Sequence, residues 1–133
     1  MKVEKHLVNI KESLDILKEC IQKGLYVERQ RTIGFHCSVA AVDMVEVYLH
    51  KNNLIEPGRQ LKHDWFTSNR RAQQRLDFDF PDKEKIIRLM TSIEAKRDLL
   101  CYGAPQEKEI VKDVISSFNE LRNLLEKMGM KYE

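Results

Sequence analysis

Apolar residues run through residues 29–50 with little polar interruption. From Ile33 to Leu49 the chain reads IGFHCSVAAVDMVEVYL, which contains no proline. A helix that is apolar around most of its circumference has to be buried on most sides, because only burial removes that surface from water. The pattern therefore predicts a central core helix from Arg29 to about Asn52, around which the rest of the chain packs.

Three further apolar stripes at helical spacing predict three more long helices. The first helix ends near Gly24, the next starts after Asp82 as N-cap and stops around residues 102–105, and the last has Pro105 in its first turn. No stretch shows a convincing strand pattern. The predicted fold class is all-α, an antiparallel up-down bundle of four long helices plus a short irregular helical segment. The stripes comprise Val3, Leu7, Ile10, Leu14, Leu17 and Ile21, then Ile86, Leu89, Met90, Ile93, Lys96 and Leu100, and then Ile110, Val111, Val114, Ile115, Phe118, Leu121, Leu125 and Met128.

A basic segment separates the second and third of these helices. Between Arg59 and Arg75, five Lys or Arg residues stand against one acid, and Trp65 and Phe66 lie among them. We expect one or two short helical pieces here, followed by an extended crossing segment over residues 76–81. Cations with interleaved aromatics can hold phosphates and stack bases, whereas the plainer interpretation makes the aromatics core or dimer contacts and the arginines a solvated surface. The candidate nucleic-acid-binding residues are Arg29, Arg59, Lys62, Arg70 and Arg71.

Composition limits the classes of function. The 133 residues carry a formal net charge of +2, which is too small to imply nucleic-acid binding by itself. No run of about 18 apolar residues occurs and the chain starts with a charged amphipathic stretch, so neither a membrane span nor a secretory signal is expected. The cysteines Cys20, Cys37 and Cys101 are widely spaced, which favours buried free thiols in a reducing cytosol.

These features predict one domain over residues 1–133, located in the cytoplasm. The sequence contains no glycine-rich phosphate loop and no nucleophile elbow, so no cofactor is expected.

A narrow polar stripe interrupts the predicted core helix. At about 100° per residue, its members share roughly a quarter of the circumference. One interpretation is the wetted edge of a buried helix, and another is the wall of a cleft or small-ligand pocket. Glu46 and His50 lie one turn apart, but no second cluster supplies the three or four ligands that Zn²⁺ needs, so no metal site is predicted. The stripe comprises Arg29, Thr32, His36, Asp43, Glu46 and His50.

Residues 94–103, which read EAKRDLLCYG, place a charged cluster and an apolar triplet before a glycine turn. This segment resembles the signature of the HEPN superfamily (higher eukaryotes and prokaryotes nucleotide-binding). In that family an arginine, a polar residue and a few apolar positions lead to a histidine near a helix boundary. Residues 29–41 (RQRTIGFHCSVAA) resemble the small-residue second helix of many members, and residues 61–66 (LKHDWF) resemble the segment that follows it.

The resemblance implies a helical bundle that often forms a two-fold dimer and that, in many members, is a metal-independent ribonuclease. Carried onto this chain, it implies that Arg97 stabilises phosphate charge and that Asp98 orients groups or contacts the ribose. Tyr102 stands where the histidine is expected. A phenol, whose unperturbed pKa is about 10, is a poor general base at pH 7, which argues against enzyme activity. His36 becomes the alternative imidazole if the polar stripe shares a cleft with Arg97 and Tyr102.

Two classes of function remain open. The first is an RNA- or nucleotide-associated protein, a toxin–antitoxin or defence component with weak or lost metal-independent ribonuclease activity. The second is a non-catalytic interaction protein that forms a homodimer or partners a minimal nucleotidyltransferase, as some members of the family do. For Arg97 alone, a simpler interpretation is an ion pair with Glu94 near the end of its helix.

Overall fold

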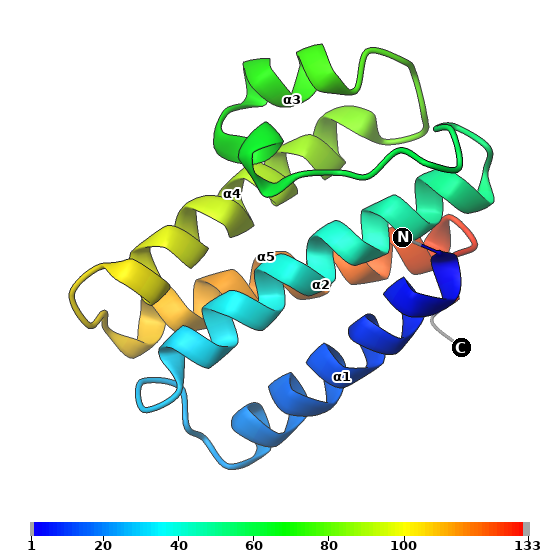
Figure 1. Cartoon of the computed structure of the whole chain (residues 1–133). Coiled ribbons are helices and arrows are strands. Elements are labelled where there is room, and N and C mark those ends of the chain that lie inside the picture. The colour runs from blue at the N-terminus through cyan, green and yellow to red at the C-terminus, as the bar shows by residue number, and fades with distance from the viewer. Residues whose placement is uncertain (1, 132–133) are drawn as a thin grey trace.

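Helix α2 (Gln30–Lys51) runs through the middle of the structure, a computed structural model that describes residues 2–131 (Figure 1). Fourteen of its 22 residues are buried. Helices α1 (Val3–Gln22), α4 (Lys83–Tyr102) and α5 (Lys108–Lys127) all pack against it, so it needs apolar side chains on several faces rather than in one stripe. The predicted core helix and the bundle of four long helices are confirmed, and residues 2–131 contain no strand.

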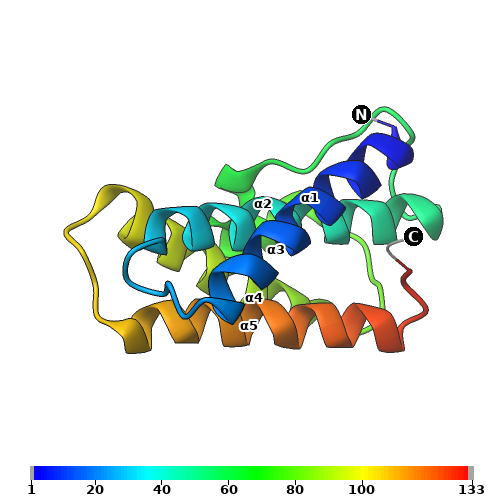
Figure 2. The ribbon, with the colours of Figure 1, turned by 90° about the horizontal axis from the view of Figure 1, so that it is seen from below.

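The four long helices alternate in direction along the chain. Helix α1 runs antiparallel to α2, and α4 runs antiparallel to both α2 and α5 (Figure 1). Figure 2 shows α5 as a separate layer beneath α1 and α2. The α1–α2 and α4–α5 loops lie together at one end of the bundle, and the described chain ends lie at the other. Two loops that are far apart in sequence therefore meet at one place.

The ends of the helices follow the predicted signals only in part. Gly24 follows α1 with a φ of +66°, a left-handed conformation that glycine adopts at little cost. Asp82 precedes α4 as predicted, but its side chain makes no capping hydrogen bond and its own φ is +56°. Pro105 lies before α5, which begins at Lys108, so the prediction that Pro105 occupies the first turn is wrong.

The basic segment folds over α4 as two short helices, η1 (His63–Thr67) and α3 (Asn69–Arg75). Trp65 and Phe66 are buried, so their interpretation as core residues is confirmed. The guanidinium carbons of Arg59 and Arg75 lie 5.3 and 6.0 Å from the centroid of the Trp65 ring. The ring thus holds two of the segment's arginines against the bundle by cation–π contact.

Helix α2 is long and apolar enough to cross a membrane by length and composition alone, although the sequence contains no unbroken apolar run. In the structure, 72% of that window is buried inside the bundle. The core helix of a soluble bundle passes the same test, because burial by neighbouring helices and burial in lipid select the same side chains.

Candidate functional site

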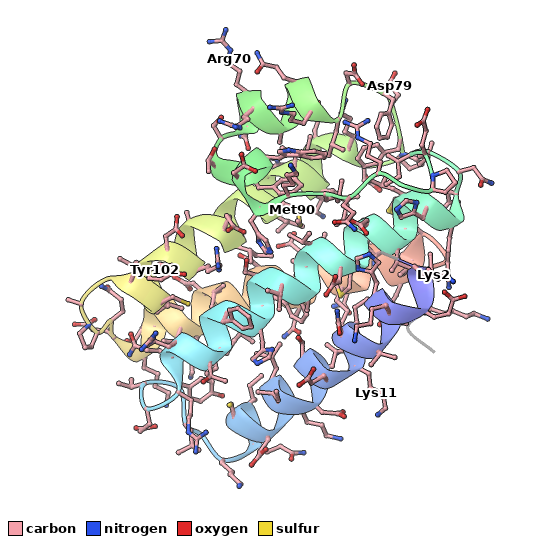
Figure 3. All side chains as sticks on the ribbon, viewed as in Figure 1. Lys2, Lys11, Arg70, Asp79, Met90 and Tyr102 are labelled. Atoms are coloured by element: carbon pink, nitrogen blue, oxygen red, sulfur yellow. The ribbon has the colours of Figure 1, made fainter. Side chains whose placement is uncertain are left out.

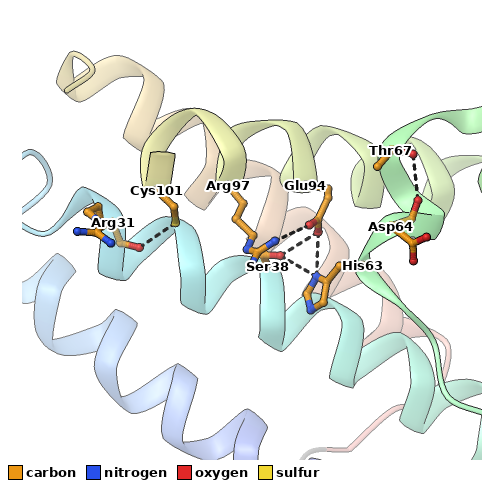
Figure 4. Close-up of polar contacts among 8 residues, drawn as sticks. All are labelled: Arg31, Ser38, His63, Asp64, Thr67, Glu94, Arg97 and Cys101. Atoms are coloured by element: carbon orange, nitrogen blue, oxygen red, sulfur yellow. Dashed lines mark hydrogen bonds and ion pairs between the residues drawn. The ribbon is translucent and has the colours of Figure 1, made fainter. Parts of the chain in front are cut away.

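Four polar side chains meet between α2, α4 and η1, and we call them the polar cluster: Ser38, His63, Glu94 and Arg97 (Figure 4). Oε2 of Glu94 accepts a hydrogen bond from Ser38 Oγ at 2.9 Å and lies 3.0 Å from Nδ1 of His63. The other carboxylate oxygen, Oε1, accepts a hydrogen bond from Nη1 of Arg97 at 3.0 Å. One carboxylate thus holds an imidazole and a guanidinium on its two oxygens.

Glu94 is the buried anchor of the polar cluster. Its side chain is 7% exposed, against 33% for His63 and 20% for Arg97. Burial opposes ionisation, but the hydrogen bond and charge of His63, the hydrogen bond of Ser38 and the charge of Arg97 outweigh it, and they lower the pKa of Glu94. Because an ionised carboxylate only accepts hydrogen bonds, Nδ1 of His63 is the donor in this contact, and Nε2 is the ring nitrogen that remains for a substrate.

Local sequence and tertiary packing both contribute to this arrangement. Glu94 and Arg97 are three residues apart on α4 and therefore share a face, and the ion pair expected between them is present. Ser38 places a small hydroxyl on α2 opposite them. His63 comes from η1, whose position over α4 is fixed by the burial of Trp65 two residues later.

Of the four predicted catalytic residues, Arg97 is the one that belongs to the polar cluster. Asp98 is exposed on the next position of α4, and Tyr102 is exposed at the end of that helix. The centroid of the Tyr102 ring lies 5.9 Å from the guanidinium carbon of Arg97. His36 instead lies 2.9 Å, Nδ1 to Oγ, from Ser13 on α1, and burial lowers its pKa. Sequence reasoning missed His63, whose only signal was its place in residues 61–66.

A groove of about 780 Å³ opens at the end of the bundle where the two loops meet. We call it the aromatic groove, because Phe35 and Tyr102 line it and are 44% and 73% exposed. Arg29, Arg31 and His36 line it as well. The structure therefore brings His36 and Tyr102 to one groove. Arg97, which the cleft hypothesis also placed there, is not one of the lining residues and is hydrogen-bonded within the polar cluster beside it.

Specific contacts hold the walls of the aromatic groove. Oε1 of Gln30 accepts a hydrogen bond from the backbone N–H of Gln106 at 2.8 Å, and its Nε2 donates to the Gln106 carbonyl at 3.3 Å. This pairing holds the α4–α5 loop beside α2, which explains why α5 begins beyond Pro105. Sγ of Cys101 lies 3.5 Å from the Arg31 carbonyl and ties the end of α4 to α2.

The polar stripe of α2 faces α1 over much of its length. Nδ1 of His6 lies 2.6 Å from Oδ1 of Asp43, and its Nε2 contacts Oε2 of Glu46, which is buried. Nε2 of His50 donates to the Arg59 carbonyl at 2.9 Å. The part of the stripe from Asp43 to His50 is therefore an internal joint, whereas Arg29, Thr32 and His36 line the open aromatic groove. Among residues 2–131, no group of three or more His, Cys, Asp or Glu side chains is arranged to hold a metal ion.

The predicted nucleic-acid-binding residues lie in two places. Arg29 belongs to the aromatic groove, and the others belong to the basic segment. There, Nη2 of Arg71 pairs with Oδ2 of Asp64 at 2.9 Å, whereas Lys62 and Arg70 are exposed, and Arg70 points away from the bundle (Figure 3). Lys62 immediately precedes His63 in the sequence, so this lysine of the basic segment is the neighbour of a polar-cluster residue.

All three cysteines are free, as expected, with Cys20 and Cys37 buried and Cys101 partly exposed. Burial raises the pKa of the Cys37 thiol far above its ordinary value and also raises the pKa of Cys101. Because the thiolate is the reactive form, neither of these two residues is set up as a nucleophile.

The chain matches no protein-family model, no curated protein and no solved structure. The polar cluster and the aromatic groove lie side by side along α4, joined by the approach of Arg97 to Tyr102. Together they offer an imidazole, a guanidinium held by a buried carboxylate, and exposed aromatic rings flanked by arginines.

Proposed function

We propose that this protein is a HEPN-like, RNA-associated protein that cleaves RNA without a metal ion. Its general base would be His63 and its phosphate-binding cation Arg97. The observation that carries the proposal is that Glu94 holds Nδ1 of His63 and Nη1 of Arg97 on its two oxygens. The family resemblance implies the role of Arg97, and the polar cluster supplies an imidazole that the motif lacks at Tyr102.

The hydrogen bond to Glu94 prepares His63 for proton transfer. It fixes the ring and its tautomer, and it leaves Nε2 to accept a proton from a substrate. In the proposed reaction, Nε2 takes the proton of a ribose 2′-hydroxyl and the 2′-oxygen attacks the adjacent phosphorus. The bond from phosphorus to the 5′-oxygen breaks, and the leaving oxygen takes a proton from water. The hydroxide that remains takes the proton held by Nε2, which restores the His63 ring. The products are a 2′,3′-cyclic phosphate end and a 5′-hydroxyl end.

Arg97 retains donors for the phosphate. The pairing with Glu94 uses one N–H of Nη1, and Nε is buried and so out of reach of a phosphate. A guanidinium carries five N–H donors, so several remain for a phosphate whose negative charge grows as the new bond forms. Removing one preorganised donor of this kind typically lowers kcat by about 10²- to 10³-fold.

The test is cleavage of a single-stranded oligoribonucleotide by the purified protein in EDTA. We expect wild-type cleavage to give 2′,3′-cyclic phosphate ends, and His63→Ala and Arg97→Ala each to lower the rate by about 100-fold or more. Arg88→Ala, which removes an exposed arginine from the same helix, serves as the matched control, and circular dichroism confirms folding. Absence of wild-type cleavage would sink the catalytic proposal, and loss of cleavage in His36→Ala but not in His63→Ala would remove His63 from it.

A second candidate function is docking of a protein partner, either a second copy of this chain or a nucleotidyltransferase. The observation that favours it is the exposed apolar surface of Val27, Phe35 and Tyr102 at the aromatic groove, since such patches mark interfaces in many proteins. Light scattering tests the homodimer. A dimer mass for the wild type and a monomer mass for Phe35→Ser would support the homodimer. A monomer mass for the wild type at all concentrations would exclude it.

A further inference from the structure

We infer that the aromatic groove binds unpaired bases of single-stranded RNA beside the phosphate held by Arg97. This inference rests on the proposed function for the nature of the substrate. It assigns Tyr102 and Phe35 to base stacking, whereas the sequence motif suggested that Tyr102 handles a proton.

The first observation is the concentration of exposed apolar side chains. Among the described residues, five large hydrophobic side chains are exposed, and Val27, Phe35 and Tyr102 all line the aromatic groove. A fourth, Leu99, directly precedes the lining residue Leu100. Scattered singly, such residues need no explanation, but three at one groove indicate a surface that a ligand covers.

The second observation is the charge around the exposed rings. Arg29 and Arg31 line the aromatic groove against one acid, Glu28. A protein partner needs only the apolar surface, whereas a nucleic acid uses both components, because its bases stack on the rings and its phosphates attract the cations. The combination of the exposed Phe35 and Tyr102 rings with Arg29 and Arg31 in one groove therefore favours nucleic acid over a purely apolar partner.

The third observation is that Arg97 connects the aromatic groove with the polar cluster. Its guanidinium pairs with Glu94 on one side and lies 5.9 Å from the Tyr102 ring on the other. From Glu94 to Tyr102 the axis of α4 advances by about 12 Å, at about 1.5 Å per residue. A strand whose scissile phosphate contacts Arg97 would therefore bring a neighbouring base to Tyr102, which has Arg97 over one face of its ring and is 73% exposed.

The form of RNA follows from the mode of recognition. Bases inside a duplex are already stacked on one another and cannot reach a protein ring, so stacking on Tyr102 and Phe35 requires unpaired nucleotides. Stacking also tolerates any base, since every base has an aromatic face. The groove should accordingly favour single strands with little preference for sequence.

The experiment measures binding of a fluorescein-labelled, mixed-sequence oligoribonucleotide by anisotropy in EDTA. The protein carries His63→Ala, so that binding is read without cleavage, and the same strand annealed to its complement is the duplex competitor. We expect Tyr102→Ala and Phe35→Ala each to weaken binding by about tenfold. Tyr102→Phe should rescue most of this loss, because the ring remains. Val8→Ala, at an exposed apolar side chain on α1, is the matched control.

Each outcome decides between the possibilities. Tenfold weaker binding in Tyr102→Ala with rescue by Tyr102→Phe supports the inference, even if the wild type cleaves nothing. Unchanged binding in Tyr102→Ala by a protein that does cleave RNA overturns the inference and leaves the proposed function standing. Equal affinity for the duplex and the single strand also overturns the inference. So does a protein that binds no RNA but forms a dimer that Tyr102→Ala dissociates.

Discussion

Nδ1 of His63 lies 3.0 Å from Oε2 of Glu94, although the two residues are 31 positions apart and belong to different elements. The contact joins the basic segment to α4 and brings an imidazole next to Arg97. The role of this contact in catalysis depends on the charge of Glu94. Only an ionised carboxylate both orients the imidazole ring and neutralises the positive charge of Arg97.

Replacing Glu94 with Gln should therefore lower both stability and cleavage. The amide keeps the size of the side chain but presents one oxygen to three former donors, and it no longer balances Arg97. We expect the free energy of unfolding to fall by about 1–3 kcal/mol, measured by urea denaturation. The matched control is Glu120→Gln, which removes an exposed ion pair with Lys85 and should cost at most about 1 kcal/mol. Equal losses in the two variants would contradict the anchoring role of Glu94.

The architecture could be predicted from the sequence because it depends on periodicity. The largely apolar character of α2 indicated a helix covered on several sides, and the spacing of Glu94 and Arg97 fixed their ion pair within one helix. Such relationships are local, so the sequence contains them directly.

The composition of the polar cluster could not be predicted in the same way. His63 reaches Glu94 only because η1 folds back over α4. The spacing of residues along the chain does not predict that η1 packs there. The polar stripe of α2 shows the same limit. Its period placed Asp43 and Glu46 on one face, but the period does not say that His6 of α1 covers them. Which helix covers a face is set by tertiary packing of the whole chain.

Gly34 is expected to be required for the close approach of α2 and α4. A Cβ at this position would lie 3.0 Å from Cβ of Leu100, and that atom cannot move without its helix. Gly34→Ala should therefore lower the free energy of unfolding by about 1–3 kcal/mol, although alanine is the better helix former. Gly58→Ala is the control, because its Cβ meets nothing within 4 Å. Thermal denaturation of both variants checks the prediction, and a stabilised Gly34→Ala would contradict it.

His6 is expected to hold α1 on the bundle. Its two ring nitrogens face carboxylate oxygens of Asp43 and Glu46, so the ring bridges the two carboxylates. His6→Ala leaves two carboxylates facing each other in a largely buried site, which should cost about 3–5 kcal/mol. Hydrogen exchange should show faster opening in α1 than in α5. Lys5→Ala, at an exposed neighbour, should leave the exchange of α1 unchanged, and slow exchange in His6→Ala would refute the role.

Stability should fall in mild acid because of His36. Burial lowers its folded-state pKa below the ordinary value of 6.5, so between these two values the unfolded chain binds more protons than the folded one. The free energy of unfolding is therefore fully maintained above pH 6.5 and decreases as the pH falls from 6.5 to the folded pKa. Urea denaturation across this window should show a smaller slope for His36→Asn than for the wild type. Identical slopes would mean that burial of His36 does not disfavour its charged form.

The basic segment should contribute to RNA binding through Lys62 more than through Arg71. Lys62 is exposed and adjacent to His63, whereas Asp64 already neutralises Arg71 through their ion pair at 2.9 Å. Lys62→Ala should weaken binding of a single-stranded oligoribonucleotide several-fold and reduce the magnitude of the salt slope by about one, because one phosphate contact is lost. Arg71→Ala should change the slope less, and Lys127→Ala, at the end of α5, is the remote control. Anisotropy titrations at several salt concentrations measure the slopes. A larger effect at Arg71 than at Lys62 would place the RNA path over α3 instead of over the polar cluster.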